Sequence, residues 1–221
     1  MFKIIQLALC LITISISAQS SFVNVISSNS SQIHFEFLVG ELQFDIINNN
    51  YDSYTQITSN GLTKTYDIGN PDLPVFSKLI EVPFNGDISF EILNSNDNVY
   101  DLASMGFHEE VLPSQASVFK NQNPTLVDFA YNENTYSKNA FYSQDLISIE
   151  RLGVMRGKSI ARIQIAPFLY NPITNELIVK KDVELIINFE ESIEPTAKAY
   201  CTQDFDINFS KLLNNNSNQN D

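Results

Sequence analysis

The chain has 221 residues, a formal net charge of −13 at pH 7 and 43% hydrophobic residues, including 16 Phe and 9 Tyr but no Trp. This length suits one fair-sized domain, or two small ones, with a substantial core. The acidic balance argues against nucleic acids and anionic membranes as partners, because their phosphates would be repelled.

Residues 1–18 have the pattern of a bacterial export signal. Lys3 supplies a positive charge, an uncharged apolar run covers 4–16, and small side chains lead up to Ala18. We therefore predict cleavage after Ala18, and the apolar run is too short to serve as a membrane anchor. Removal of Lys3 takes the net charge from −13 to −14. The chain is expected to be exported, passing the periplasm and then being secreted or held at the cell surface.

Strand patterns follow along the chain. Apolar and polar residues alternate with a period of two over 33–39, 42–46, 88–92, 161–165 and 183–189, and a further strand is expected over 76–82. Such alternation is typical of antiparallel sheets with one buried face. No long helical stripe is present. We predict an all-β fold, an antiparallel β-sandwich or a distorted barrel.

Turn residues separate these strands. Asn60-Gly61, residues 69–72 and residues 85–87 are expected turns, and residues 171–175 should close a hairpin between a strand ending near Ala166 and one starting near Leu177. Residues 113–150 differ, because they are polar and aromatic with weak periodicity. We interpret them as one long irregular loop region, a kind of segment that often carries function.

Catalytic and metal-binding patterns are missing. Cys10 lies in the export signal, where Leu9 disfavours a lipoprotein site, so Cys201 is the single cysteine of the mature chain and no intramolecular disulfide is expected. Cys201 lacks the neighbouring features of a nucleophile, and His34 and His108 are expected to be exposed. The chain is predicted not to be an enzyme.

Oxygen-rich stretches at 67–72 and 94–98 could in principle hold calcium. Neither has the ligand spacing of a known calcium loop, and both are better interpreted as turns stabilised by Asn and Asp side chains. We predict no metal and no cofactor.

Three segments, in this order, resemble the prodomains of gingipain-type cysteine peptidases. They are residues 69–75, residues 112–124 and residues 153–189, and residues 205–211 are similar to the segment just before the peptidase domain. Each pattern alone is common, but their order and spacing behind an export signal are specific to the family. The motif positions are Gly69, Pro71, Pro74, Pro113, Arg156, Gly157, Tyr170, Asn171 and Pro172.

The resemblance implies a β-sandwich prodomain that inhibits the zymogen of a secreted cysteine peptidase and assists its folding. Prodomains of this family place a basic loop residue in the Arg or Lys specificity pocket, and the matching residue here is Lys120, flanked by Phe119 and Asn121. Lys211 matches a possible release site. The implied partner is the cognate peptidase domain, in cis or in trans, because this chain stops near the junction.

Three regions follow from these patterns: an export signal over 1–18, a β-rich propeptide domain over 19–195, and a junction with an Asn-rich polar tail over 196–221. Gly157, together with Gly153, is expected to form a bulge or tight bend, and Tyr170 and Pro172 to shape the hairpin. The residues do not distinguish Arg from Lys specificity of the partner, nor a fragment from a stand-alone copy.

A second function stays open. The chain could be a secreted β-sandwich that binds glycans or surface partners through the aromatic residues of the loop region, Tyr131, Tyr136, Phe141 and Tyr142. The absence of Trp weighs against sugar stacking. On this alternative, Lys120 would be an ordinary solvated lysine.

Overall fold

The computed structural model describes residues 22–29, 31–49, 52–118, 120, 128–155 and 157–190. The predicted export signal and the predicted tail over 196–221 lie outside these residues. Within the described ranges, no helix is both long enough and apolar enough to cross a bilayer.

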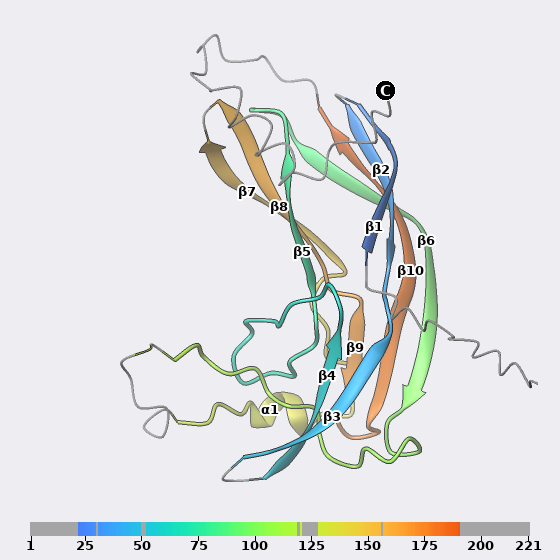
Figure 1. Ribbon diagram of the computed structural model, residues 1–221, viewed down its shortest axis with the longest axis vertical. Coiled ribbons are helices and arrows are strands. Elements are labelled where there is room, and N and C mark those ends of the chain that lie inside the picture. The colour runs from blue at the N-terminus through green and yellow to red at the C-terminus, as the bar shows by residue number, and fades with distance from the viewer. Residues whose placement is uncertain are drawn as a thin grey trace, which may run out of the picture.

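Two antiparallel sheets face each other (Figure 1). The larger has the order β1-β2-β10-β6, with β9 also paired to β10, and its strands are Phe22–Ser28, Gln32–Leu38, Glu176–Phe189, Ile88–Asp101 and Phe168–Asn171. The smaller has the order β5-β8-β7, with strands Phe76–Glu81, Lys158–Ile165 and Ile147–Met155. The predicted antiparallel all-β fold is confirmed as a sandwich, and the sheets do not close into a barrel.

The core lies between these sheets and follows the period-two pattern of the sequence. Strand β10 alternates buried and partly buried residues along most of its length, with Leu185 and Ile187 fully buried. Strand β2 does the same. Phe37 of β2 meets Phe76 of β5 with ring centroids 5.2 Å apart, which joins the two sheets through aromatic packing.

A third pair of strands lies at the end of the sandwich where α1 is found (Figure 1). Strands β3 (Leu42–Asn48) and β4 (Ser53–Ser59) form an antiparallel hairpin, and α1 is a single turn, Glu133–Tyr136. Phe44 of β3 contacts Phe107 with ring centroids 5.4 Å apart, so the hairpin is anchored through its inner face.

The predicted hairpin is correct at its turn and wrong in its first arm. The turn over residues 172–175 joins β9 to β10, with Tyr170 opposite Leu177. Strand β8 ends at Ile165 and pairs with β5 and β7 in the other sheet. The chain changes sheets at Ala166-Pro167, where proline has no N–H to continue a ladder. Periodicity does not reveal such a change of sheet.

The predicted turn over residues 94–98 is also wrong, because these residues lie inside β6. Strand β6 pairs with β10 from Ile88 to Asp101, with register shifts opposite Lys181 and at Leu93. Asp97 forms an ion pair with Lys180 of the partner strand at 3.0 Å. Pairing with the buried strand β10 overrides the local turn preference of an Asn- and Asp-rich sequence.

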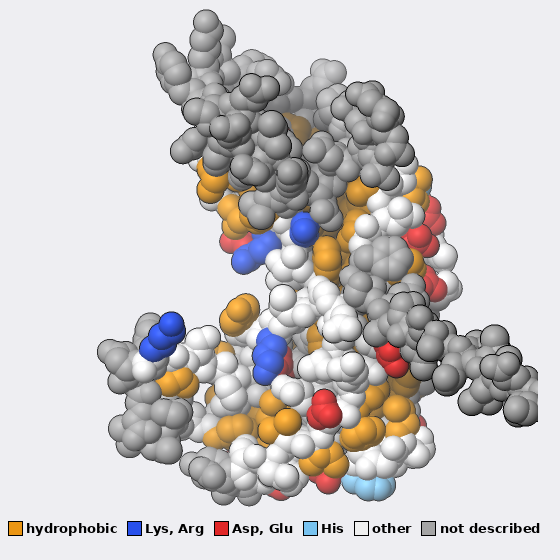
Figure 2. Space-filling model, in the orientation of Figure 1, with side chains coloured by type: hydrophobic (Ala, Val, Ile, Leu, Met, Phe, Trp, Pro, Cys, Tyr) orange, Lys and Arg blue, Asp and Glu red, His pale blue; other side chains and the backbone are white. Residues whose placement is uncertain are grey.

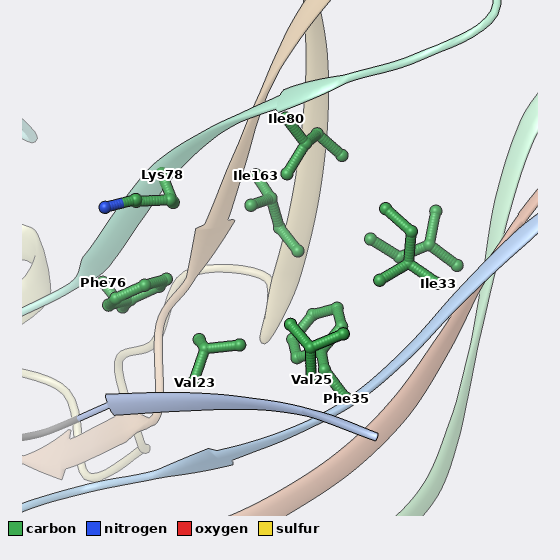
Figure 3. A pocket seen from close by; sticks show the side chains of 9 residues that line it. Val23, Val25, Ile33, Phe35, Phe76, Lys78, Ile80 and Ile163 are labelled. Carbon is green, nitrogen blue, oxygen red and sulfur yellow. The ribbon is translucent and has the colours of Figure 1, made fainter. Parts of the chain in front are cut away.

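A small apolar cavity remains between the sheets. Figure 3 shows Val23 and Val25 of β1 pointing toward Ile80 of β5 and Ile163 of β8, with the amine of Lys78 directed away from them. Apart from Lys78, the side chains that line this cavity are apolar. The cavity is a packing gap that offers few side-chain polar groups to a ligand such as a sugar.

Candidate functional site

The segment that contains Lys120 leaves the body of the molecule beside α1. Residues 115–118 and 128–131, before and after Lys120, project on the same side of the molecule (Figure 1), and Lys120 between them is exposed. Figure 2 shows Lys and Arg side chains at a few separated places on this face, one of them on that projection. Phe119 and Asn121, the predicted neighbours of Lys120 at the site, lie outside the described residues.

We call residues 111–115 the incoming flank and residues 130–132 the outgoing flank. The incoming flank is held by backbone hydrogen bonds to two other segments. Leu112 donates to Thr55 of β4 at 2.8 Å, and its carbonyl accepts from Asp72 at 2.8 Å. Ser114 then exchanges two bonds with the turn at 69–70, donating to Asn70 and accepting from Gly69, each at 2.8 Å. The flank is therefore paired on both sides although it belongs to no regular strand.

Two buried tyrosine hydroxyls fix Val111 in this flank. The Tyr136 hydroxyl donates to the Val111 carbonyl at 2.7 Å, and the Val111 N–H donates to the Tyr170 hydroxyl at 3.3 Å. Both tyrosines are 2% exposed or less. Burial raises the pKa of Tyr170 to about 12 and raises that of Tyr136 further, so both hydroxyls keep their protons at neutral pH.

The outgoing flank is held by the same turn. Asn132 caps α1, its side chain accepting from the N–H of Asn134 at 3.2 Å, while its own N–H donates to the Gly69 carbonyl at 2.9 Å. The Asn70 side-chain oxygen accepts from Asn132 at 2.9 Å and from the Thr135 hydroxyl at 2.5 Å. The turn at 69–70 thus connects the incoming flank to the outgoing one.

Gly69 allows this close meeting of three segments. Its φ of +84° is accessible to glycine at little cost, and it is buried. A Cβ at this position would lie 3.4 Å from the Asn132 nitrogen. That distance is an ordinary contact, so it is the backbone conformation of the turn that requires glycine.

Above this turn, the side chain of Gln115 joins the two flanks directly. Its amide nitrogen donates to the carbonyls of Ala130 at 2.8 Å and Pro113 at 3.0 Å, and its amide oxygen accepts from the Ala130 N–H at 2.9 Å. We call these contacts of Gln115 with Ala130 and Pro113 the loop neck. The chain enters the segment that contains Lys120 at Gln115 and returns from it at Ala130.

The other motif positions lie under or beside this site. Pro71, Pro74 and Pro113 are buried, and Pro71 forms a bridge with Pro113. Asn171 accepts from the N–H groups of Ile173 and Thr174, at 3.1 and 3.4 Å, so its side chain stabilises the hairpin turn that contains the buried Pro172.

Gly157, with φ +82°, lies in the turn between β7 and β8, and Gly153 lies at a register shift in β7. Arg156 and Lys211 lie outside the described residues.

The residues that join these segments are Gln115, Asn70 and Asn132, and none of them is among the predicted site residues. Asn132 followed by Glu133 is a typical start of a helix, which is a signal for its capping role. Gln115 gives no signal in the sequence, because an isolated glutamine has no pattern.

His34, expected in solvent, is half-buried and lies 2.8 Å from Glu184, whereas His108 is exposed as expected. In the described ranges, no three His, Cys, Asp or Glu side chains are grouped as a metal site would require.

A family model described as Propeptide_C25 matches residues 16–216. The chain belongs to this family. Lys-gingipain HG66 from Porphyromonas gingivalis is 28% identical to it over 181 residues, which are 82% of this chain and 10% of that protein. Gingipain R2 from the same species is 20% identical over 176 residues, covering 78% of this chain and 22% of the relative. The chain therefore spans only about a tenth of Lys-gingipain, and residues 16–216 correspond to the propeptide family.

Solved structures give the same result. A structure concerning the zymogenic latency of gingipain K from Porphyromonas gingivalis aligns with a TM-score of 0.73 at 27% identity, covering 81% of this chain and 98% of that one. A complex of the pro- and mature domains of RgpB from that species aligns with a TM-score of 0.71, covering 87% and 97% of the two chains. At 17% identity, the second match supports the fold alone.

Proposed function

We propose that this propeptide inhibits the zymogen of a gingipain-type cysteine peptidase, with Lys120 occupying the peptidase's specificity pocket. The peptidase domain is the partner, in cis or in trans, and the propeptide also assists its folding. The chain is exported by the signal at residues 1–18, passes through the periplasm and acts outside the cell or at its surface. Lys211 is the proposed release site.

The observation that carries this proposal is the combination of family and geometry. The chain belongs to a propeptide family, and Lys120 is an exposed basic residue on a projection whose base is held by hydrogen bonds. No carboxylate of the described residues forms an ion pair with Lys120. Its amine is therefore available to an acidic group of a partner.

Physical chemistry favours a lysine in this role. Its ammonium is a compact charge on a long apolar stem, so it can reach a carboxylate at the bottom of a pocket. A charge pair shielded from water is strengthened when further hydrogen bonds complete it. The propeptide is otherwise strongly acidic, so attraction to an acidic pocket has to come from this local charge.

Inhibition measurements on two single variants test the proposal. The purified chain should inhibit a Lys-specific gingipain-type peptidase more tightly than an Arg-specific one. Lys120→Ala should raise the inhibition constant at least 30-fold, about 2 kcal/mol, because the pocket would keep an unpaired charge. Lys120→Arg should move the preference toward the Arg-specific enzyme.

Lys138→Ala is the matched control, because Lys138 is an exposed lysine just after α1. It should leave inhibition unchanged, and all three variants should unfold at the denaturant concentration of the unmodified chain. Equal inhibition by the Lys120→Ala variant and the unmodified chain, with both folded, would contradict the assigned role of Lys120.

A further inference from the structure

Tyr66 stands out from the surface in the loop between β4 and β5. It is 83% exposed, the highest value among the exposed large hydrophobic residues of the described ranges. A single apolar side chain in water needs no special explanation. Its surroundings decide whether it indicates a contact surface.

The residues on either side of Tyr66 are fixed to the body of the molecule. Thr65 is buried, and its carbonyl accepts from the Ser114 hydroxyl at 2.9 Å. The Asp67 carboxylate accepts from the Tyr142 hydroxyl at 2.5 Å. The backbone of Tyr66 therefore has little freedom left to lose when a partner covers the ring, and a contact made in this way costs less conformational entropy.

Ile68, two residues farther on, lies at the edge of an open surface hollow. The hollow has a volume of about 590 Å³ and is lined by residues 68–69 and 129–134. Ile68 is 51% exposed, and Tyr131, which also lines the hollow, is 38% exposed. The ring of Tyr131 stacks on the buried Tyr136 with centroids 4.5 Å apart, so this wall of the hollow is held in place.

We call these three exposed side chains the apolar rim: Tyr66, Ile68 and Tyr131. The rim adjoins the base of the segment that contains Lys120. Ser114, which bonds to the residue before Tyr66, directly precedes the loop neck, and Tyr131 directly follows it. In Figure 1 the loop between β4 and β5 lies on the same side of the molecule as residues 115–118 and 128–131.

A peptidase that takes Lys120 into its pocket needs a contact surface larger than one side chain. Specific protein–protein interfaces bury roughly 800 Å² on each partner, and the residues that contribute most to their affinity are rich in Tyr. The surface at the base of the Lys120 segment has to supply part of that area. The rim offers large apolar side chains there, and none of the three is charged.

We propose that the apolar rim is a second contact surface for the peptidase domain, with Tyr66 as its anchor, and that it binds an uncharged apolar patch beside the specificity pocket. The inference rests on the proposed function, because Lys120 in the pocket brings the peptidase against this side of the propeptide. Lys120 recognises the pocket, and the rim adds affinity that does not depend on the pocket.

Calorimetry with a Lys-specific gingipain-type peptidase tests the rim through three variants. Tyr66→Ala should raise the Kd about tenfold or more, because the patch that the ring covers would lose its contact. Tyr66→Phe keeps the ring and should bind within about threefold of the unmodified chain. Ile68→Ala should raise the Kd about threefold or more. A tenfold change in Kd corresponds to about 1.4 kcal/mol.

Ile26→Ala is the matched control for Ile68→Ala. Ile26 is 50% exposed, and it lies on strand β1 of the larger sheet, away from residues 128–131 (Figure 1). Its replacement should leave the Kd unchanged. All these positions are exposed, so each variant should unfold at the denaturant concentration of the unmodified chain.

The double variant of Tyr66→Ala and Lys120→Ala separates the rim from the pocket. The two residues contact different parts of the peptidase, so their effects on the free energy of binding should add. Tyr66→Ala should therefore weaken binding by the same factor with lysine or alanine at position 120.

The outcomes distinguish the inference from the function on which it rests. If Lys120→Ala binds as tightly as the unmodified chain, the proposed function is wrong. If Lys120→Ala weakens binding while Tyr66→Ala and Ile68→Ala bind like the unmodified chain, the function stands and the rim is refuted. Sedimentation in which the rim variants lose self-association, with their peptidase affinity unchanged, would assign the rim to a second copy of the chain and refute the proposal.

Discussion

At the scale of single residues, the buried side chain of Asp72 lowers the stability of the folded chain when it is charged. Its side chain is buried beside the turn at 69–70 and accepts from the N–H of Thr65 at 3.1 Å. Burial raises its pKa, although Lys64 at 3.8 Å and the hydrogen bond from Thr65 act in the opposite direction. The folded chain thus holds the Asp72 proton more tightly than the unfolded chain does.

The sign of this shift gives a pH-dependent prediction. The stabilising contribution of Asp72 is complete below the ordinary pKa of an aspartate, about 3.9, and is lost as pH rises through the raised pKa of the folded chain. Asp72→Asn keeps an oxygen acceptor for Thr65 without a buried charge. Urea unfolding should therefore show the variant to be more stable than the unmodified chain at pH 7, with the difference shrinking below pH 4.

Asp87→Asn serves as the comparison, because Asp87 is exposed, and it should change stability little at either pH. A destabilised Asp72→Asn variant at pH 7 would mean that the pair with Lys64 outweighs the cost of burial. In that case the charged Asp72 side chain would stabilise the folded chain at pH 7.

At the scale of elements, the turn at 69–70 organises the site because two flanks and α1 all bond to it. Gly69→Ala would place a non-glycine residue at φ +84° and a Cβ 3.4 Å from the Asn132 nitrogen. Strained backbone of this kind costs about 1–3 kcal/mol. Denaturant titration should show that loss, and inhibition should weaken as well because the strain falls on the turn to which both flanks bond.

Gly106→Ala is a matched control, since its φ of +94° is similar and a Cβ there would meet nothing within 4 Å. It should lower stability through backbone strain alone and leave inhibition unchanged. Equal effects of the two variants on inhibition would show that Gly69 has no special connection to the loop.

The elements also show how far sequence reasoning reaches. Where a strand has one buried face, as in β2 and β10, the period of two predicts it directly. The pattern fails for β6, whose Asn- and Asp-rich half is extended only because β10 pairs with it. It fails again at Pro167, because a change of sheet leaves no periodic trace. The sequence prediction lacks strands β1, β4, β7 and β9, and the first four residues of β7 fall in the region that it interprets as an irregular loop.

Some residues of the candidate site are indicated by the sequence and others are not. Resemblance to a family indicated Lys120, and the turn residues indicated Gly69 and Pro71. The residues that fix the loop, such as Gln115 and Tyr136, act through contacts between segments far apart in sequence. Tyr136 lies 25 residues from the Val111 carbonyl that it holds. No local pattern encodes such a pairing.

At the scale of the whole molecule, the sandwich holds the residues on either side of the Lys120 segment at the end where α1 lies. The two sheets share an apolar core, and the end of the sandwich near α1 holds the loop base through three segments. We propose that the core supplies stability and that the segment around Lys120 supplies the contact with the enzyme. The net charge of −13 is of the sign and size that favours solubility.

A competition experiment can show whether Lys120 occupies the specificity pocket of the peptidase. Calorimetry would measure binding of the propeptide to a Lys-specific gingipain-type peptidase at rising concentrations of a small lysine-based ligand of that pocket. If Lys120 occupies the pocket, the apparent Kd should rise in proportion to ligand concentration, and Lys120→Ala should remove this dependence. Unchanged propeptide affinity at saturating ligand would show that the propeptide binds elsewhere and would contradict the account.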